Sequence, residues 1–460
     1  MERKANNSRT NLPPHTWMTL FLVVLSAIFV ANGVRVSIVK SLVTLVMAAA
    51  IAIYVIVEVR LNGVKWTRYN ILVMTMALLF LILTVIRRNY TRYTRGNLTL
   101  CLAALVIGVV PAHFTKKDVH HETLLLSGAV ILAFLPLAIM ALVSVFTARP
   151  IYLLDPERAV GIQTAGLISD RIFIGVHPNY AATICVQCIL LAVYAYANTR
   201  VRELKVAFVA VMMVYFLALV HTQSRSGSIL LGLSVGAFGF RWAWRRFERR
   251  HVVRLLVGIL LVAISILLCI WLIDMVFAID VRIALRLNPW IAKEQTSASR
   301  IVTEGLLNLT GNGRGVLWRG VLKYLRANPL TLLVGLGAQP VYRFIEPFTE
   351  TDFWYVHLHN SGFEVLVRGG LPMLGLVVGM LLCLVRPCVH QLLGFDGEGE
   401  RLSCIRPILV GIMLVVSVSE AMLFVYATFP NILFFIVSGQ IILLGEDRRP
   451  HCESDRSNNY

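Results

Sequence analysis

Three side chains that can do chemistry lie at or near the ends of long apolar runs. His359 begins one run, Arg225 begins another, and Arg314 lies in the polar segment that precedes His359. An imidazole titrates near neutral pH and is the usual general base. Arginine is permanently charged and binds phosphate oxygens through paired hydrogen bonds. The set predicts a site that removes a proton beside a phosphate-type leaving group whose charge must be neutralised.

Each of these residues also has a purely structural interpretation. A histidine at a helix start can simply satisfy local hydrogen bonds, and Arg225 can extend its charge to the membrane interface. An arginine at membrane depth is costly, however, and marks a functional candidate. Glu364 and Glu420 are acids inside apolar runs. Either can orient the imidazole or bind sugar hydroxyls, or it can stabilise the fold through hydrogen bonds alone.

The sequence does not predict a metal site or a cofactor. Asp352, His357 and His359 are the nearest approach to a ligand set, but their spacing matches no usual helical or loop pattern. We therefore expect the arginines, and not a divalent cation, to neutralise the leaving group.

The composition predicts an all-α integral membrane protein. Of 460 residues, 57% are hydrophobic and 15% are charged, whereas soluble domains carry about 25% charged residues. Apolar runs of roughly 18 or more residues are typical of membrane helices. About twelve are predicted, at 16–34, 38–59, 70–86, 97–112, 122–147, 178–198, 205–222, 226–240, 252–277, 359–386, 405–425 and 428–445.

These runs divide the chain into four parts. Residues 1–277 would carry the first nine helices, 278–358 one large external loop, 359–445 the last three helices, and 446–460 a cytoplasmic tail. The first run is interpreted as a retained helix, since no small-residue cleavage site follows it. No internal repeat is evident, which argues against many secondary transporters.

The net charge of +18 is explained by the membrane and not by nucleic acid. Basic residues accumulate in cytoplasmic loops, and the connection between 226–240 and 252–277 is the most basic one. Counting helices from it places 278–358 on the outer, periplasmic side. The same count places Arg87, Arg88, Arg92 and Arg95 outside. Either an early helix is miscounted, or these arginines form a patch for a phosphorylated acceptor.

The loop 278–358 is too long for an ordinary connection and is expected to be functional. Within it, 315–328 predicts an amphipathic helix with Leu317, Val321, Leu322 and Leu325 on one face. This helix can lie flat on the membrane or pack as a lid on the bundle.

The cysteines predict no disulfide in the loop, because none lies between 280 and 356. Cys185 and Cys188 have the spacing of a redox pair but lie inside an apolar run, so packing is the better interpretation.

Taken together, these features resemble the O-antigen ligase and polymerase superfamily. The resemblance is carried by four motifs: His177-Pro178-Asn179-Tyr180-Ala181-Ala182; Ser224-Arg225-Ser226-Gly227; Arg314 with Trp318, Pro329 and Gly335-Leu336-Gly337; and His359-Asn360 with Gly370. The family often has Gly, Thr or Tyr where this chain has Met373. The likeness runs from about 160 to 385, and the order of the motifs is more specific than any one of them.

The resemblance implies a metal-independent, inverting glycosyltransferase in a bacterial inner membrane. Its donor would be a glycan on undecaprenyl diphosphate, bound at the periplasmic face. His359 would deprotonate the acceptor hydroxyl, Arg225 and Arg314 would hold the diphosphate, and Asn360, Glu364 and Trp318 would support them.

Several functions stay open at this point. A ligase would transfer the glycan to the lipid A-core, a polymerase to a second lipid-linked glycan, and a third option is transfer to protein. The basic residues of the external loops favour the anionic lipid A-core. A transporter or flippase is the competing class; it would need charged residues at mid-membrane, whereas the candidates here gather at the outer boundary. Sugar identity, oligomeric state and any chain-length regulator are not predicted.

Overall fold

The computed structural model describes residues 13–32, 46, 49–63, 66–86, 102–109, 114–147, 151–152, 159–162, 172–173, 178–287, 314–337, 339, 341–349, 357–394, 400–424 and 428–446. The helices of this part are α1 (Pro14–Asn32), the π-helical η1 (Ile56–Asn62), α3 (Arg68–Ile86), α5 (Lys116–Thr147), α6 (Pro178–Asn198), α7 (Arg202–His221), α8 (Arg225–Arg246), α9 (His251–Leu287), α11 (Arg314–Ala327), α12 (Leu330–Val334), α13 (Tyr342–Ile345), the 3-10 turn η4 (Glu346–Phe348), α14 (Ser361–Leu393), α15 (Ile405–Ser419) and α16 (Phe429–Glu446). Three short antiparallel strands also occur: β1 (Ile151–Tyr152), β2 (Ala159–Ile162) and β3 (Ile172–Phe173).

The predicted helical membrane architecture is confirmed in its main feature. Six described helices are long and apolar enough to cross a membrane: α3, α5, α6, α7, α9 and α14. Shorter apolar helices occur at Pro14–Ala27, Ala49–Glu58, Ile405–Ser419 and Phe429–Gly445. Twelve spans stay a prediction, because 97–112 is described only over 102–109. The predicted span 226–240 forms α8, which is not among the six.

Several predicted boundaries differ from the structure by six or more residues. Helix α9 continues to Leu287, ten residues past the predicted end at 277. The predicted span 405–425 is wrong at its end, because α15 stops at Ser419 and Glu420 has extended backbone angles. The end of α15 illustrates the reason: hydropathy records where apolar residues lie, whereas the hydrogen bonds made at the end of a helix decide where it stops.

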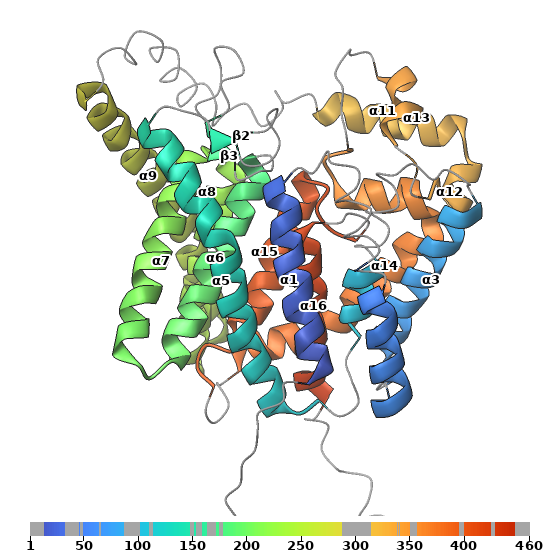
Figure 1. Ribbon diagram of the computed structural model, residues 1–460, viewed down its shortest axis with the longest axis horizontal. Coiled ribbons are helices and arrows are strands. Elements are labelled where there is room, and N and C mark those ends of the chain that lie inside the picture. Colours follow the sequence, from blue (N-terminus) through green and yellow to red (C-terminus); the bar gives the residue numbers. More distant parts are fainter. Residues whose placement is uncertain are drawn as a thin grey trace, which may run out of the picture.

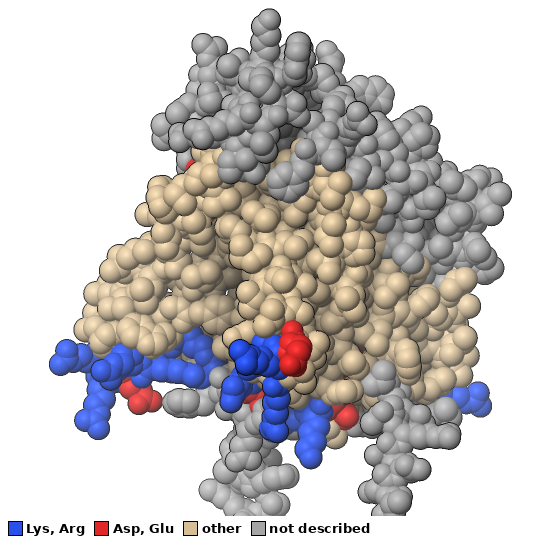
Figure 2. Space-filling view, turned by 60° about the vertical axis from the view of Figure 1, so that its left-hand side comes forward, with Lys and Arg blue, Asp and Glu red and all other residues tan. Residues whose placement is uncertain are grey.

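Basic side chains gather at one end of the bundle (Figure 2). Lys and Arg side chains line the end formed by the α6–α7 and α8–α9 connections and the start of α5 (Figure 2). Helices α11, α12 and α13 lie at the opposite end (Figure 1). The Arg87–Arg95 segment and Asp352 fall outside the described residues, so the acceptor-patch prediction cannot be placed on the fold.

A buried polar network joins helices at the basic end. Arg406 of α15 is fully buried and forms a 2.6 Å ion pair with Glu400, which also accepts a 2.7 Å hydrogen bond from the Tyr194 hydroxyl. Gln440 of α16 donates to Glu122 of α5 over 3.0 Å. Such paired polar groups, inside an apolar environment, fix which helices are neighbours.

Helix α11 forms as predicted and packs as a lid on α14. Leu317, Val321 and Leu325 are buried against Leu358 and Val367. This arrangement corresponds to the second of the two alternatives, packing on the bundle.

The buried face of α11 includes Tyr324 and excludes Leu322, which is 45% exposed. The prediction for Leu322 was wrong because it follows Leu317 by five residues, which turns it away from the i, i+4, i+7 and i+8 stripe.

The two cysteines of α6, Cys185 and Cys188, are fully buried among apolar side chains, as the packing interpretation requires.

A kink in α14 provides the docking place for the segment after α12. Gly370 breaks the helix with φ +68° and ψ −172°, and Pro372 has no N–H to donate. The carbonyls of Val367 and Arg368 are therefore left without their helical partners. The backbone N–H groups of Leu336 and Gly337 bond to them at 2.9 and 2.8 Å. The two glycine motifs of the sequence thus meet in space.

We predict that Gly370→Ala lowers the stability of the protein by about 1–3 kcal/mol, because a side chain at this positive φ is strained. The added Cβ would also lie 2.7 Å from the carbonyl oxygen of Leu332. Thermal unfolding of the purified protein in detergent measures the loss. Gly375→Ala in the same helix is the matched control, since its Cβ would meet no atom within 4 Å. Equal midpoints for the two variants would contradict the role given to Gly370.

Candidate active site

The chain turns sharply into α14 at His359 and Asn360. His359 has φ +50°, a left-handed conformation that few non-glycine residues adopt. Asn360 caps the helix, its side-chain oxygen accepting the N–H of Phe363 at 2.9 Å. Strained backbone of this kind persists only where the surroundings enforce it, and it is concentrated at functional sites. Asn360, predicted as a supporting residue, therefore fixes the start of the helix beside His359.

The other two predicted supporting residues hold the peptide just before His359. The N–H of Leu358 donates to Oε1 of Glu364 at 2.8 Å, and its carbonyl accepts Nε1 of Trp318 at 3.0 Å. Glu364 is completely buried, and its second oxygen accepts Nε of Arg368 at 2.7 Å. Leu358 is thus clamped from α11 on one side and from α14 on the other, which limits the positions open to His359.

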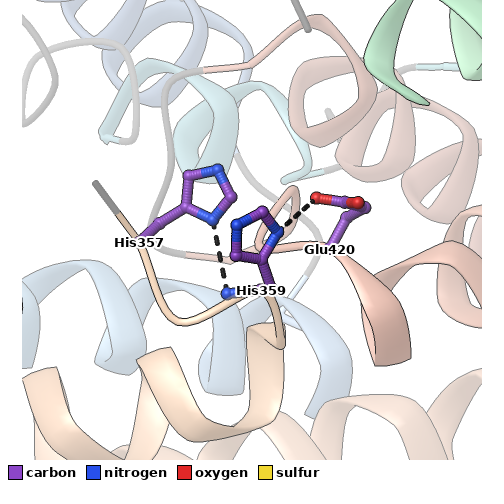
Figure 3. A group of neighbouring side chains, drawn as sticks. All are labelled: His357, His359 and Glu420. Carbon is purple, nitrogen blue, oxygen red and sulfur yellow. Dashed lines mark hydrogen bonds and ion pairs between the residues drawn. The ribbon is translucent and has the colours of Figure 1, made fainter. Parts of the chain in front are cut away.

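A carboxylate brings His359 and Arg314 together. Nδ1 of His359 lies 3.0 Å from Oε2 of Glu420 (Figure 3), and Nη2 of Arg314 lies 2.6 Å from Oε1. The amide of Asn179 also donates to Oε1, at 2.6 Å. Glu420 follows the last residue of α15 and is 1% exposed. Four segments that are distant in sequence therefore meet at one side chain.

The electrostatics of this cluster keep Glu420 ionised. Burial alone would raise the pKa of its carboxyl group, but the hydrogen bond and charge of His359, the charge of Arg314 and the amide of Asn179 lower the pKa to about 2. The group is therefore an anion at any pH near neutrality. Its partner Arg314 keeps about a quarter of its side chain exposed, so the guanidinium faces both the carboxylate and the solvent.

Arg225 is linked to this cluster through the neighbouring residue, Ser224. Ser224 caps α8 and donates to Oδ1 of Asn179 at 2.9 Å, while the same amide group donates to Glu420. Arg225 is the first residue of α8, is exposed, and interacts electrostatically with Asp274 of α9. The hydrogen bonds thus join His359 and Arg314 through Glu420, and Arg225 follows the capping residue of the same network.

Sequence reasoning singled out His359 and Arg314 but not the carboxylate that joins them. Glu420 was predicted only as one of two acids that can orient the histidine, and Asn179 only as part of a family motif. The signal for Glu420 was an acid in an apolar run, which Glu364 shares. Only the structure distinguishes the roles of the two acids. Glu364 fixes the backbone of Leu358, and Glu420 contacts the imidazole of His359.

The same corner holds a group that can bind a metal ion. Ligand atoms of His357, His359 and Glu420 all lie within 4.8 Å of one another (Figure 3). Nδ1 of His357 accepts the backbone N–H of His359 at 3.3 Å. Sequence analysis considered the two histidines together with Asp352 as possible metal ligands. In the structure the third possible ligand beside the histidines is Glu420.

One of three comparisons with known proteins gives a match. A family model described as O-antigen ligase matches residues 208–378. This match includes Arg225, Arg314 and His359, and it confirms the resemblance to the O-antigen ligase-like superfamily. It implies a glycosyltransferase-type enzyme and, with the apolar helices, a multi-pass membrane protein. Neither the curated proteins nor the solved structures gave a significant match.

We predict that Arg314 and Glu420 are energetically coupled. Each single substitution, Arg314→Gln or Glu420→Gln, should destabilise the protein, and the double variant should lose less than the sum by about 0.5–3 kcal/mol. Unfolding of the purified protein in detergent provides the four free energies. Arg319→Gln, on the exposed side of the same helix, is the control and should add to Glu420→Gln within about 0.5 kcal/mol. Additive losses for the Arg314 pair would mean that the contact contributes nothing.

Proposed function

We propose that this chain, whose residues 208–378 match the O-antigen ligase family, is an inverting glycosyltransferase that uses a lipid-linked donor. The donor would be a glycan on undecaprenyl diphosphate and the acceptor a sugar hydroxyl. The observation that carries the proposal is the Glu420 carboxylate, which contacts a candidate base at Oε2 and a candidate phosphate-binding cation at Oε1. Proton removal and charge neutralisation are thus brought together.

His359 acts as the general base in this proposal. With Nδ1 donating to Glu420, the lone pair is on Nε2, and the anion stabilises the imidazolium that forms. Nε2 takes the proton of the acceptor hydroxyl while its oxygen attacks the anomeric carbon. The bond from that carbon to the diphosphate oxygen breaks on the opposite face, and the configuration inverts. An oriented base typically contributes about 10²–10⁴-fold in rate.

Arg314 and Arg225 bind the diphosphate. Undecaprenyl diphosphate departs with the electron pair of the broken bond, and guanidinium groups stabilise the added charge. Arg314 is already fixed at one end by Glu420 and partly exposed at the other, so it can bind phosphate oxygens without leaving the cluster. This division of work needs no metal ion and no cofactor.

The charge distribution supports a periplasmic site. Lys and Arg line the end of the bundle away from α11 (Figure 2), and basic ends of membrane proteins face the cytoplasm. His359 lies beside α11, at the other end, since Trp318 of that helix contacts Leu358. In a bacterium this orientation supports a site at the outer face of the inner membrane.

An anionic acceptor is favoured, and with it the ligase function. Arg319, Lys323 and Arg326 of α11 and Arg343 of α13 are all exposed near the site. They suit the phosphorylated core of lipid A. A polymerase acceptor, a second lipid-linked glycan, is anionic as well, and a lipopolysaccharide gel from a deletion strain separates the two. Loss of all polymer from the core, with lipid-linked polymer accumulating, supports the ligase, whereas a core with one repeat supports the polymerase.

A transport function makes a different prediction. The purified protein, given a lipid-linked donor and an acceptor, releases undecaprenyl diphosphate only if it catalyses transfer. Absence of that product under conditions in which the lipid is moved across the membrane would favour a transporter or flippase.

We predict that His359→Ala reduces transfer by about 10²–10⁴-fold while the protein stays folded. The reason is that the variant lacks the imidazole that Glu420 contacts. Initial rates with purified protein, lipid-linked donor and acceptor measure the loss, and the thermal midpoint in detergent reports the fold. His390→Ala, at the other end of α14, is the matched control and should keep its activity. Near wild-type transfer by His359→Ala would refute the assignment.

A further inference from the structure

We propose that His357, His359 and Glu420 form a Zn²⁺ site whose occupation inhibits the transfer reaction. Their ligand atoms lie within 4.8 Å of one another, and the two imidazole rings are 4.1 Å apart between centroids. Small side-chain rotations bring such a group around one ion, because tetrahedral zinc holds nitrogen and oxygen ligands at about 2.0–2.2 Å. The inhibitory part of this inference rests on the proposed function, whereas the binding site itself does not.

The backbone between the two histidines is fixed in advance. Leu358 is bonded through its N–H to Glu364 and through its carbonyl to Trp318. The rings of His357 and Tyr180 are stacked with a 19° angle between their planes. Both histidines are therefore presented on one short, immobilised segment, so metal binding would cost little conformational entropy.

The third ligand is oriented in the way that metal ligands usually are. Oε1 of Glu420 accepts hydrogen bonds from Arg314 and Asn179, while Oε2 faces His359. Hydrogen bonds of this kind fix a ligating carboxylate and raise metal affinity by about 10–100-fold. The donor set of two imidazoles and one carboxylate is the zinc set that leaves a fourth position for water.

The surroundings also predict a reversible site, not a permanent one. The positive charge of Arg314, 2.6 Å from the far oxygen of the same carboxylate, opposes a divalent cation. Calcium and magnesium prefer oxygen ligands, so the two imidazoles select zinc over these ions.

Zinc at this place would remove the base. Coordination needs the single lone pair of the neutral His359 ring and the carboxylate oxygen that now faces the ring. If Nδ1 is the ligating atom, its proton moves to Nε2, so the ring keeps one proton and has no free lone pair. A coordinated His359 cannot take the proton of the acceptor hydroxyl. Transfer would stop until a chelator or dilution removes the ion.

Direct binding tests the site without any substrate. The full-length protein in detergent is freed of metal with EDTA, and Zn²⁺ is titrated by calorimetry. His357→Asn keeps a side-chain oxygen for the backbone N–H of His359 but removes one imidazole. We expect this variant to lose at least about tenfold in Zn²⁺ affinity. His390→Asn makes the same change at the other end of α14 and should bind as the wild type does. Absence of binding by the wild type, or equal affinity in His357→Asn, would overturn the site.

The transfer assay tests the inhibition separately. Zn²⁺ should lower the wild-type rate, EDTA should restore it, and His357→Asn should transfer normally while resisting the ion, because His357 has no assigned part in the reaction. Equal inhibition of both proteins, or stimulation by Zn²⁺, would overturn the inhibitory role. Zinc binding without transfer under any condition would instead refute the proposed function and leave the site in place.

Discussion

The site depends on one buried carboxylate. Glu420 contacts His359, Arg314 and Asn179, which come from the start of α14, the start of α11 and the start of α6. A buried anion is costly unless nearly all its hydrogen-bonding positions are filled. The carboxylate therefore acts as a constraint on the whole fold, because the starts of three helices must converge on it. The chemistry and the packing are two consequences of the same contact.

The end of α15 is where sequence and structure separate most clearly. The residues from 405 to 425 were predicted as one span, although Ser417, Ser419 and Glu420 interrupt their apolar pattern just where α15 ends. The stop is explained by contacts from the start of α14. The side-chain amide of Asn360 donates to the backbone carbonyl of Val418, and the hydroxyl of Ser361 donates to the backbone carbonyl of Glu420. The same hydroxyl accepts the N–H of Met422. A helix end supplied from 60 residues away cannot be read from periodicity.

Other parts of the site follow from the sequence because their causes are local. The amphipathic stripe of α11 predicts the helix and most of its buried face, and the residues His359-Asn360 at the edge of an apolar run predict the start of α14. The glycines at 335, 337 and 370 indicate a close backbone contact, but the sequence does not show which segments make it. The partner emerges only from the kink at Gly370, where freed carbonyls of α14 accept N–H groups from Leu336 and Gly337.

The kink and the clamp together explain why the lid and the base keep their relative positions. The first part of α14 carries Glu364, which holds Leu358, and ends at the carbonyls that hold the segment after α12. The segment from α11 to the residues after α12 is thereby attached at two places, through Trp318 of α11 to Leu358 and through Leu336, after α12, to Val367 of α14. Two attachments fix the orientation of a helix, whereas one would leave it free to pivot. Arg314, the first residue of α11, is therefore held beside Glu420 by the rigid frame as well as by its own ion pair.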